Sequence, residues 1–143
     1  MRIKSAIIAL ALTFCAFGNA ARATDMRELS NYLVYIEAFK HFFELCGAET
    51  KLPDEQVLYA RSHIASRRTL ILAGLTDAER DQLTSEALAK VPKFVEGVRA
   101  ETAKKQPNKS LPQLCRENMF GGIVESEREA EAQEDAEIRK AKE

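Results

Sequence analysis

Cys46 and Cys115 are the residues of this chain whose chemistry is easiest to predict. A disulfide between them would close a loop of about 70 residues and stabilise the fold by roughly 4 kcal/mol. The sequence contains no C-x-x-C motif, the usual form of a thiol redox pair, and no C-x-x-C-H haem signature. We therefore predict a structural disulfide, with a metal site or a redox pair as the alternatives. A third cysteine, Cys15, lies in an apolar N-terminal segment that we expect to be removed.

Three residues of one predicted helix, Glu37, His41 and Glu44, could contribute ligands to a metal ion. Their i, i+4, i+7 spacing places them on one helix face. A carboxylate-bridged di-metal bundle would carry Glu-x-x-His on two helices, and neither His41 nor His63 has a glutamate three residues before it. These residues are therefore weak candidates, and a solvated polar face is the alternative. We expect no metal ion and no other cofactor.

Catalytic chemistry has little support in the sequence. Ser62 and His63 are adjacent on a predicted helix, so their side chains diverge, whereas a nucleophilic serine needs a base within hydrogen-bond reach. The sequence contains neither a phosphate-binding loop nor a dinucleotide-binding fingerprint. We predict that the protein is not an enzyme.

An aromatic group on the first predicted helix and a basic group on the second form a candidate partner surface. Its members are Tyr32, Tyr35, Phe39, Phe42, Arg61, Arg67 and Arg68. The aromatic residues cover more than one narrow stripe, and a helix that is apolar on several sides is either buried or a contact surface. The basic residues could receive an acidic partner or an anionic ligand. Two alternatives stay open: the aromatic residues fill the core, and the acidic C-terminal segment balances the basic ones.

Helices must position these residues, because apolar side chains recur every three or four positions along most of the chain. The first predicted helix begins near Thr24, carries Cys46 at the end of its apolar stripe, and stops at Gly47. The second begins at Pro53, which suits a first helical turn, and ends near Gly74.

Two further helices follow, each opened by a capping box. Residues 76–79 read T-x-x-E and begin the third helix, in which Pro92 is expected to cause a kink or a break. Residues 106–109 form the clearest loop, and residues 110–113 read S-x-x-Q and begin the fourth helix. Cys115 lies near the start of this helix, so the predicted disulfide joins it to the end of the first.

The pattern predicts an all-α fold: a small four-helix bundle, or five helices if Pro92 breaks the third, cross-linked by one disulfide. Residues 24–124 form the predicted domain. Residues 125–143 carry eight acidic and four basic residues. We expect a polar C-terminal tail, helical or frayed, because this segment shows no apolar face to bury.

Residues 1–23 have the features of a secretory signal peptide. Arg2 and Lys4 precede an apolar run over residues 5–18, and Ala21-Arg22-Ala23 fits a cleavage site. The apolar run is shorter than the roughly 20 residues of a membrane-spanning helix. We therefore expect a periplasmic or secreted protein with no membrane span after cleavage.

Net charge argues against nucleic acid as a partner. Removing residues 1–23 takes away three of the 21 basic residues and none of the 22 acidic ones, so the remainder has a charge of 18 − 22 = −4. Nucleic-acid-binding domains carry a strongly basic surface.

These features together predict an exported, non-enzymatic protein-binding module. A periplasmic immunity or inhibitor protein and an assembly factor are concrete forms of it, and a periplasmic stress chaperone with many clients is the alternative. The expected partner is another exported or envelope protein. A homodimer through the first helix is also compatible with the aromatic surplus.

Overall fold

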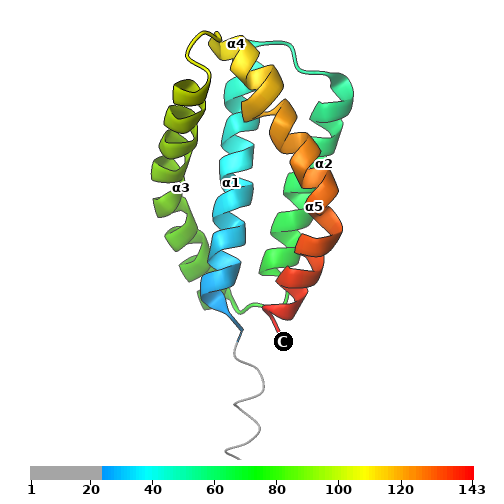
Figure 1. Cartoon of the computed structure of the whole chain (residues 1–143). Helices are drawn as coiled ribbons and strands as arrows, with labels where there is room; N and C mark the ends of the chain where they lie inside the picture. Colours follow the sequence, from blue (N-terminus) through cyan, green and yellow to red (C-terminus); the bar gives the residue numbers. More distant parts are fainter. Residues whose placement is uncertain (1–23) are drawn as a thin grey trace, which may run out of the picture.

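Four long helical segments lie side by side in the computed structural model, which describes residues 24–143 (Figure 1). The elements are α1 (Met26–Glu49), α2 (Asp54–Leu72), α3 (Asp77–Lys105), α4 (Leu111–Leu114), the π-helical turn η2 (Cys115–Met119) and α5 (Gly121–Lys140). The short α4, η2 and α5 together take the place of the fourth predicted helix. The all-α four-helix prediction is confirmed, and the described part of the chain contains no strand. The predicted signal peptide, with Cys15, lies outside the described residues.

The central element is α1, which packs between α3 on one side and α2 on the other, with α5 beside α2 (Figure 1). Its buried residues recur at the helical period and include Leu29, Leu33, Phe39 and Phe42. By contrast, α3 has 29 residues and buries only Leu83, Ala87 and Val95, because it packs mainly against α1. No helix within residues 24–143 has both the length and the apolar content that crossing a membrane requires.

Both predicted capping boxes are present. Thr76 donates its backbone N–H to Glu79 Oε2 at 2.8 Å, and Ser110 donates its backbone N–H to Gln113 Oε1 at 2.9 Å. Each pair satisfies a backbone N–H at a helix start that has no partner within the helix.

Two predicted helix ends are absent. Gly47 does not end α1, which continues to Glu49. Pro92 lies inside α3 without dividing it, so it creates no fifth helix. Pro92 is exposed, so the carbonyl group of Leu88 that loses its donor can be hydrated instead of being buried unpaired.

The predicted disulfide is confirmed and joins the end of α1 to the start of η2. The Cα atoms of Cys46 and Cys115 lie 5.3 Å apart, and both side chains are fully buried. The bond therefore fixes the point from which the last part of the chain returns along the bundle.

The C-terminal segment is helical, as one of its two predicted forms, but it packs against the bundle instead of lying free in solvent. Ile138 on α5 and Ala141 directly after α5 are buried. Asp25 donates its backbone N–H to the carbonyl oxygen of Ala141 at 2.7 Å, so the C-terminus lies beside the start of α1 (Figure 1). The expectation failed because most of the face that α5 turns to α2 is polar, which a search for apolar periodicity does not detect.

Close backbone approach explains the glycine pair at the start of α5. A Cβ atom at Gly121 would lie 2.0 Å from the carbonyl oxygen of Arg116, and one at Gly122 would lie 2.8 Å from that of Glu117. Both oxygens belong to the residue five positions earlier, within η2. Only glycine fits here without moving the backbone of the π-helical turn.

The close approach predicts a large cost for a single methyl group. We expect Gly121→Ala to lower the free energy of unfolding by about 3 kcal/mol, because the carbonyl of Arg116 must move. Urea unfolding of the oxidised domain measures this. Gly97→Ala is the control, because Gly97 has open space around it in α3. Alanine favours helix over glycine by about 1 kcal/mol, so this variant should not lose stability. Equal stability of the two variants would contradict the close approach.

The buried disulfide predicts a loss of about 4 kcal/mol in the free energy of unfolding when Cys46→Ala and Cys115→Ala are combined, because a long loop is no longer closed in the unfolded chain. Denaturant unfolding with and without reductant checks it. The wild type should lose stability in reductant, whereas the double variant should not respond. If reductant leaves the free energy of unfolding of the wild type unchanged, the disulfide contributes no stability.

Candidate functional site

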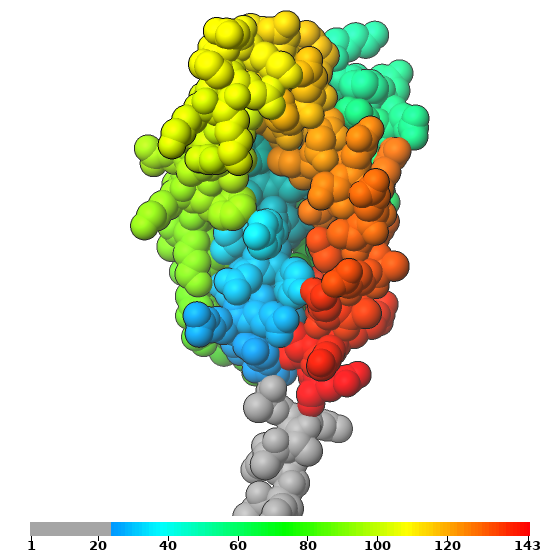
Figure 2. Space-filling model, viewed as in Figure 1, coloured from blue at the N-terminus to red at the C-terminus, as the bar shows by residue number. Residues whose placement is uncertain are grey.

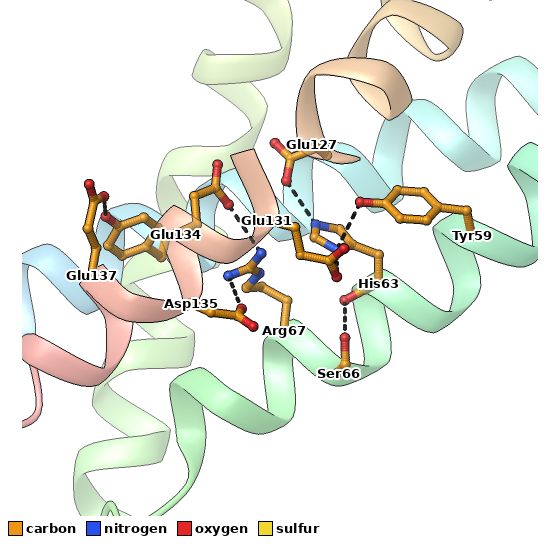
Figure 3. Close-up of polar contacts among 10 residues, drawn as sticks. Tyr59, His63, Ser66, Arg67, Glu127, Glu131, Glu134, Asp135 and Glu137 are labelled. Carbon is orange, nitrogen blue, oxygen red and sulfur yellow. Dashed lines mark hydrogen bonds and ion pairs between the residues drawn. The ribbon is translucent and has the colours of Figure 1, made fainter. Parts of the chain in front are cut away.

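Two basic side chains on α2 are buried against α5 and form the most polar part of the interior. His63 is 2% exposed and Arg67 is 3% exposed. They stand four residues apart, so they share a helix face. The facing side of α5 supplies four carboxylates at matching helical spacing (Figure 3), namely Glu127, Glu131, Glu134 and Asp135. We call these six residues the ion-pair cluster.

Both imidazole nitrogens of His63 face carboxylates. Nε2 lies 2.8 Å from Glu127 Oε2, and Nδ1 lies 3.4 Å from Glu131 Oε1. The ring also stacks on Tyr59, with the ring centroids 5.2 Å apart, and meets Phe39 of α1 edge-on at 6.0 Å. Because an imidazole can donate from both nitrogens only when it is protonated, this arrangement favours the positively charged form.

The pKa of His63 is raised above its ordinary value. Burial by itself would lower the pKa, since it disfavours the charged ring. The hydrogen bond and negative charge of Glu127 oppose burial, Glu131 adds to their effect, and Arg67 works against it. The net result is that His63 stays charged to a higher pH than a free histidine does.

Arg67 is held by two carboxylates further along α5. Its Nη1 donates to Asp135 Oδ1 at 2.6 Å, and its Nη2 lies 3.4 Å from Glu134 Oε2 as an ion pair without hydrogen-bond alignment. A buried base without such partners would be very costly. The acidic segment therefore neutralises α2 within the fold, which is one of the alternatives left open by the sequence.

Three members of the predicted partner surface are buried by the fold itself and offer a partner little area. Phe39 is 3% exposed and Phe42 is 1% exposed, because both fill the core beneath α3 and α5. Phe39 stacks on Phe120, with the ring centroids 5.9 Å apart. Arg67 is taken up by the ion-pair cluster. For Phe39 and Phe42, the core alternative is the one that the structure shows.

The other four members are at least partly accessible. Tyr35 and Arg61 are exposed, whereas Tyr32 is half-buried and donates its hydroxyl group to Glu137. Burial, followed by that carboxylate, raises the pKa of Tyr32 above its ordinary value. Arg68 is half-buried and pairs through Nε with Glu37 Oε1 at 3.0 Å.

The weak metal candidates are not brought together. Glu37 pairs with Arg68, His41 is exposed, and Glu44 lies 3.9 Å from Lys40 on the surface. Within residues 24–143, no group of three His, Cys, Asp or Glu side chains is arranged to hold a metal ion.

An aromatic pocket of about 230 Å³ lies between α1, α3 and the start of α5. Four rings line it, from Tyr35, Phe39, Phe42 and Phe94. The rings of Tyr35 and Phe94 meet edge-on, with their centroids 5.2 Å apart. Ser126 and Glu127 of α5 are its polar members, so Glu127 belongs both to this pocket and to the ion-pair cluster.

A shallower hollow of about 690 Å³ continues along α3 and shares Phe94 and Val98 with the pocket. Lys90 and Lys93 line it as well. In Figure 2, α1 is visible at the bottom of a depression between α3 and α5. We call the pocket and the hollow together the aromatic groove.

Sequence reasoning missed the α3 and α5 sides of the groove and all four carboxylates of the cluster. One signal for the cluster was present: the acids at 127, 131, 134 and 135 recur at the spacing of His63 and Arg67. No comparable signal identified Phe94 or Ile123, because their role depends on how α3 and α5 flank α1.

The raised pKa of His63 predicts a defined pH dependence. In the native state His63 binds its proton more tightly than in the unfolded chain, so its contribution to stability is complete below about pH 6.5 and is lost as pH rises through the native pKa. The free energy of unfolding of the wild type minus that of His63→Gln should therefore fall with increasing pH.

Denaturant titrations between about pH 5 and pH 9 measure this difference, a range that brackets the free-histidine value. His41→Gln is the matched control, because His41 is exposed and lies outside the ion-pair cluster. A His63 difference that is flat or rises with pH would show that His63 carries no additional proton in the native state.

No protein-family model, curated protein or solved structure matches this chain. Any assignment of a function must therefore rest on the side chains of residues 24–143. In the ion-pair cluster, both buried bases already have carboxylate partners. In the aromatic groove, Tyr35 leaves 58% of its surface exposed beside Phe94. The groove is accordingly the better candidate for a binding site.

Proposed function

We propose that this protein is an exported, non-enzymatic binding module that holds another exported or envelope protein on the aromatic groove. The observation that carries the proposal is the exposure of Tyr35, which is 58% exposed although it lies on the central helix of the bundle. Large aromatic side chains that remain exposed in a groove are typical anchors of protein–protein interfaces.

Uneven burial of α3 supports the same surface. This helix has 29 residues but packs mainly against α1, and it leaves Phe94 and Val98 only partly buried along the groove. Leu88, on another side of the same helix, is 51% exposed. A partner that covers α3 would bury apolar area that the fold alone leaves in water.

The groove also has a rigid base. Phe39 and Phe43 of α1 stack on Phe120, which directly follows the disulfide-anchored turn η2. Phe39 is itself one of the residues that line the pocket. A surface that is already ordered loses less conformational entropy when a partner binds.

A non-catalytic role agrees with the placement of the two side chains considered for hydrolysis. Ser62 is exposed on α2, whereas the neighbouring His63 is buried in the ion-pair cluster. His63 thus faces carboxylates of α5, not the hydroxyl group of Ser62.

The test is affinity capture from native envelope extract with the oxidised domain of residues 24–143. We expect one stoichiometric partner, and we expect Tyr35→Asp to reduce its recovery at least about tenfold, because a buried unpaired charge replaces an aromatic anchor. Leu58→Asp is the matched control. Leu58 is 67% exposed on α2, does not line the groove, and should bind as the wild type does.

Three outcomes are informative. A single partner lost only in Tyr35→Asp supports a dedicated role such as immunity, inhibition or assembly. Many weakly held clients, increasing in acid or heat, would favour the stress chaperone instead. Equal recovery with both variants would remove the aromatic groove from the proposed surface. Thermal melting of each variant confirms that it is folded before the comparison.

A further inference from the structure

We propose that the aromatic pocket recognises its partner protein through one basic side chain, a lysine or an arginine, whose charge lies against Glu127 and whose stem lies among the four rings. This inference rests on the proposed function, since it specifies the chemistry that the partner must present. It makes the pocket a cation site with a defined acidic end and an aromatic wall.

The aromatic wall is suited to a cation with an apolar stem. Tyr35, Phe39, Phe42 and Phe94 converge on one pocket from α1 and α3. Aromatic faces attract ammonium and guanidinium groups, and the attraction increases where water is excluded. The methylene chain of a lysine or arginine would bury apolar area against the same rings.

The acidic end is a single carboxylate that is already held in place. Glu127 is the only charged side chain among the described residues that line the pocket. One of its oxygens faces Nε2 of His63 at 2.8 Å, and in Figure 3 the other oxygen points away from the imidazole. A carboxylate fixed in this way loses little side-chain entropy when a second cation reaches it.

The charge balance behind the pocket also favours a cation. Even when His63 is protonated, the ion-pair cluster contains two positive groups and four carboxylates, which gives 2 − 4 = −2. The nearby Arg128 does not change this balance, because it pairs with Glu55 at 3.2 Å. A carboxylate on the partner would be repelled by this net negative charge.

The volume of the pocket and the charge of the hollow along α3 define the partner further. The pocket, at about 230 Å³, is smaller than the roughly 300–1,000 Å³ of sites that hold drug-sized molecules, so a single side chain fits it better. The hollow along α3 would hold the adjoining segment. Its charged lining residues are Lys90, Lys93 and Glu101, and the excess of positive charge favours acidic residues next to the basic anchor.

Binding is then linked to the protonation of His63, because both cations use Glu127. The groups that face His63 are Glu127 and Glu131 from α5, Tyr59 and Arg67 from α2, and the uncharged ring of Phe39 from α1. A cation in the pocket should lower the pKa of His63, and by reciprocity its affinity should rise as pH rises and His63 loses its proton.

The experiment uses small probes that reproduce the ends of the two side chains. The oxidised domain of residues 24–143 is titrated with n-butylammonium and n-butylguanidinium, with n-butanol as the neutral analogue, while NMR follows Tyr35, Phe94, Ile123 and the ring of His63. We expect the cations to shift the pocket resonances, to bind at least about tenfold more tightly than butanol, and to lower the pKa of His63. Equal binding of butanol would overturn the proposal.

Two variants isolate the two halves of the site. Glu127→Gln should weaken cation binding about tenfold or more, whereas Glu129→Gln, an exposed position on the same helix, should have no effect. Phe94→Leu keeps an apolar side chain and leaves all six residues of the ion-pair cluster unchanged, so it tests the aromatic wall even if Glu127→Gln fails to fold. It should reduce the preference for the cations over butanol, and an unchanged preference would contradict a role for the rings.

The outcomes separate this inference from the proposed function. If the probes fail to bind while a captured partner still depends on Tyr35, the cation site is wrong and the binding function stands. If the probes bind but no partner is captured, the proposed function falls. Tighter binding of n-butyltrimethylammonium than of either side-chain probe would assign the pocket to a small quaternary amine or a lipid headgroup, which would overturn the assignment to a partner's side chain.

Discussion

Burial of two bases on one helix is the constraint on which the arrangement of this protein depends. His63 and Arg67 can occupy the interior only if carboxylates come with them, since a buried charge without a partner would be very unfavourable. Those carboxylates lie on α5, so the acidic end of the chain must dock along α2 for the bundle to form. The same docking brings Glu127 to the pocket between α1 and α3, which means that one structural requirement also creates the acidic end of the groove.

The turn before α5 makes that docking possible. The disulfide holds Cys115 at the end of α1, and from this fixed point η2 and α5 run along the bundle beside α2 (Figure 1). The π-helical turn η2 leads directly into α5, and Gly121 allows the backbone of α5 to approach the carbonyl of Arg116. Covalent anchoring and close backbone approach together set the position at which the acidic residues of α5 meet the bases of α2.

What the sequence predicted and what it missed have separate physical causes. Apolar periodicity and the two capping boxes depend only on residues close in sequence, and they correctly predicted four helices. The disulfide was also predicted correctly, because two cysteines allow only one pairing. Docking of residues 125–143 was missed because charge pairing, with only Ile138 and Ala141 as apolar anchors, replaces an apolar stripe there. Among the aromatic residues, Tyr35 is exposed and Phe39 and Phe42 are buried, a division set by how α3 and α5 flank α1. That placement is tertiary, so helical period alone could not supply it.

Glu127 has two roles, and this makes stability and recognition interdependent. As a structural residue it keeps His63 charged and ties α5 to α2. As a pocket residue it lies at the polar end of the groove. A cation that uses this carboxylate weakens the attraction between Glu127 and His63, so the affinity of the groove is limited by the stability of the α2–α5 contact. Arg67, with its own carboxylates further along α5, keeps the two helices together independently of Glu127. In the proposed complex, the pairing of two bases with four acids would let the fold share one carboxylate with a partner without losing the contact that holds the C-terminal helix.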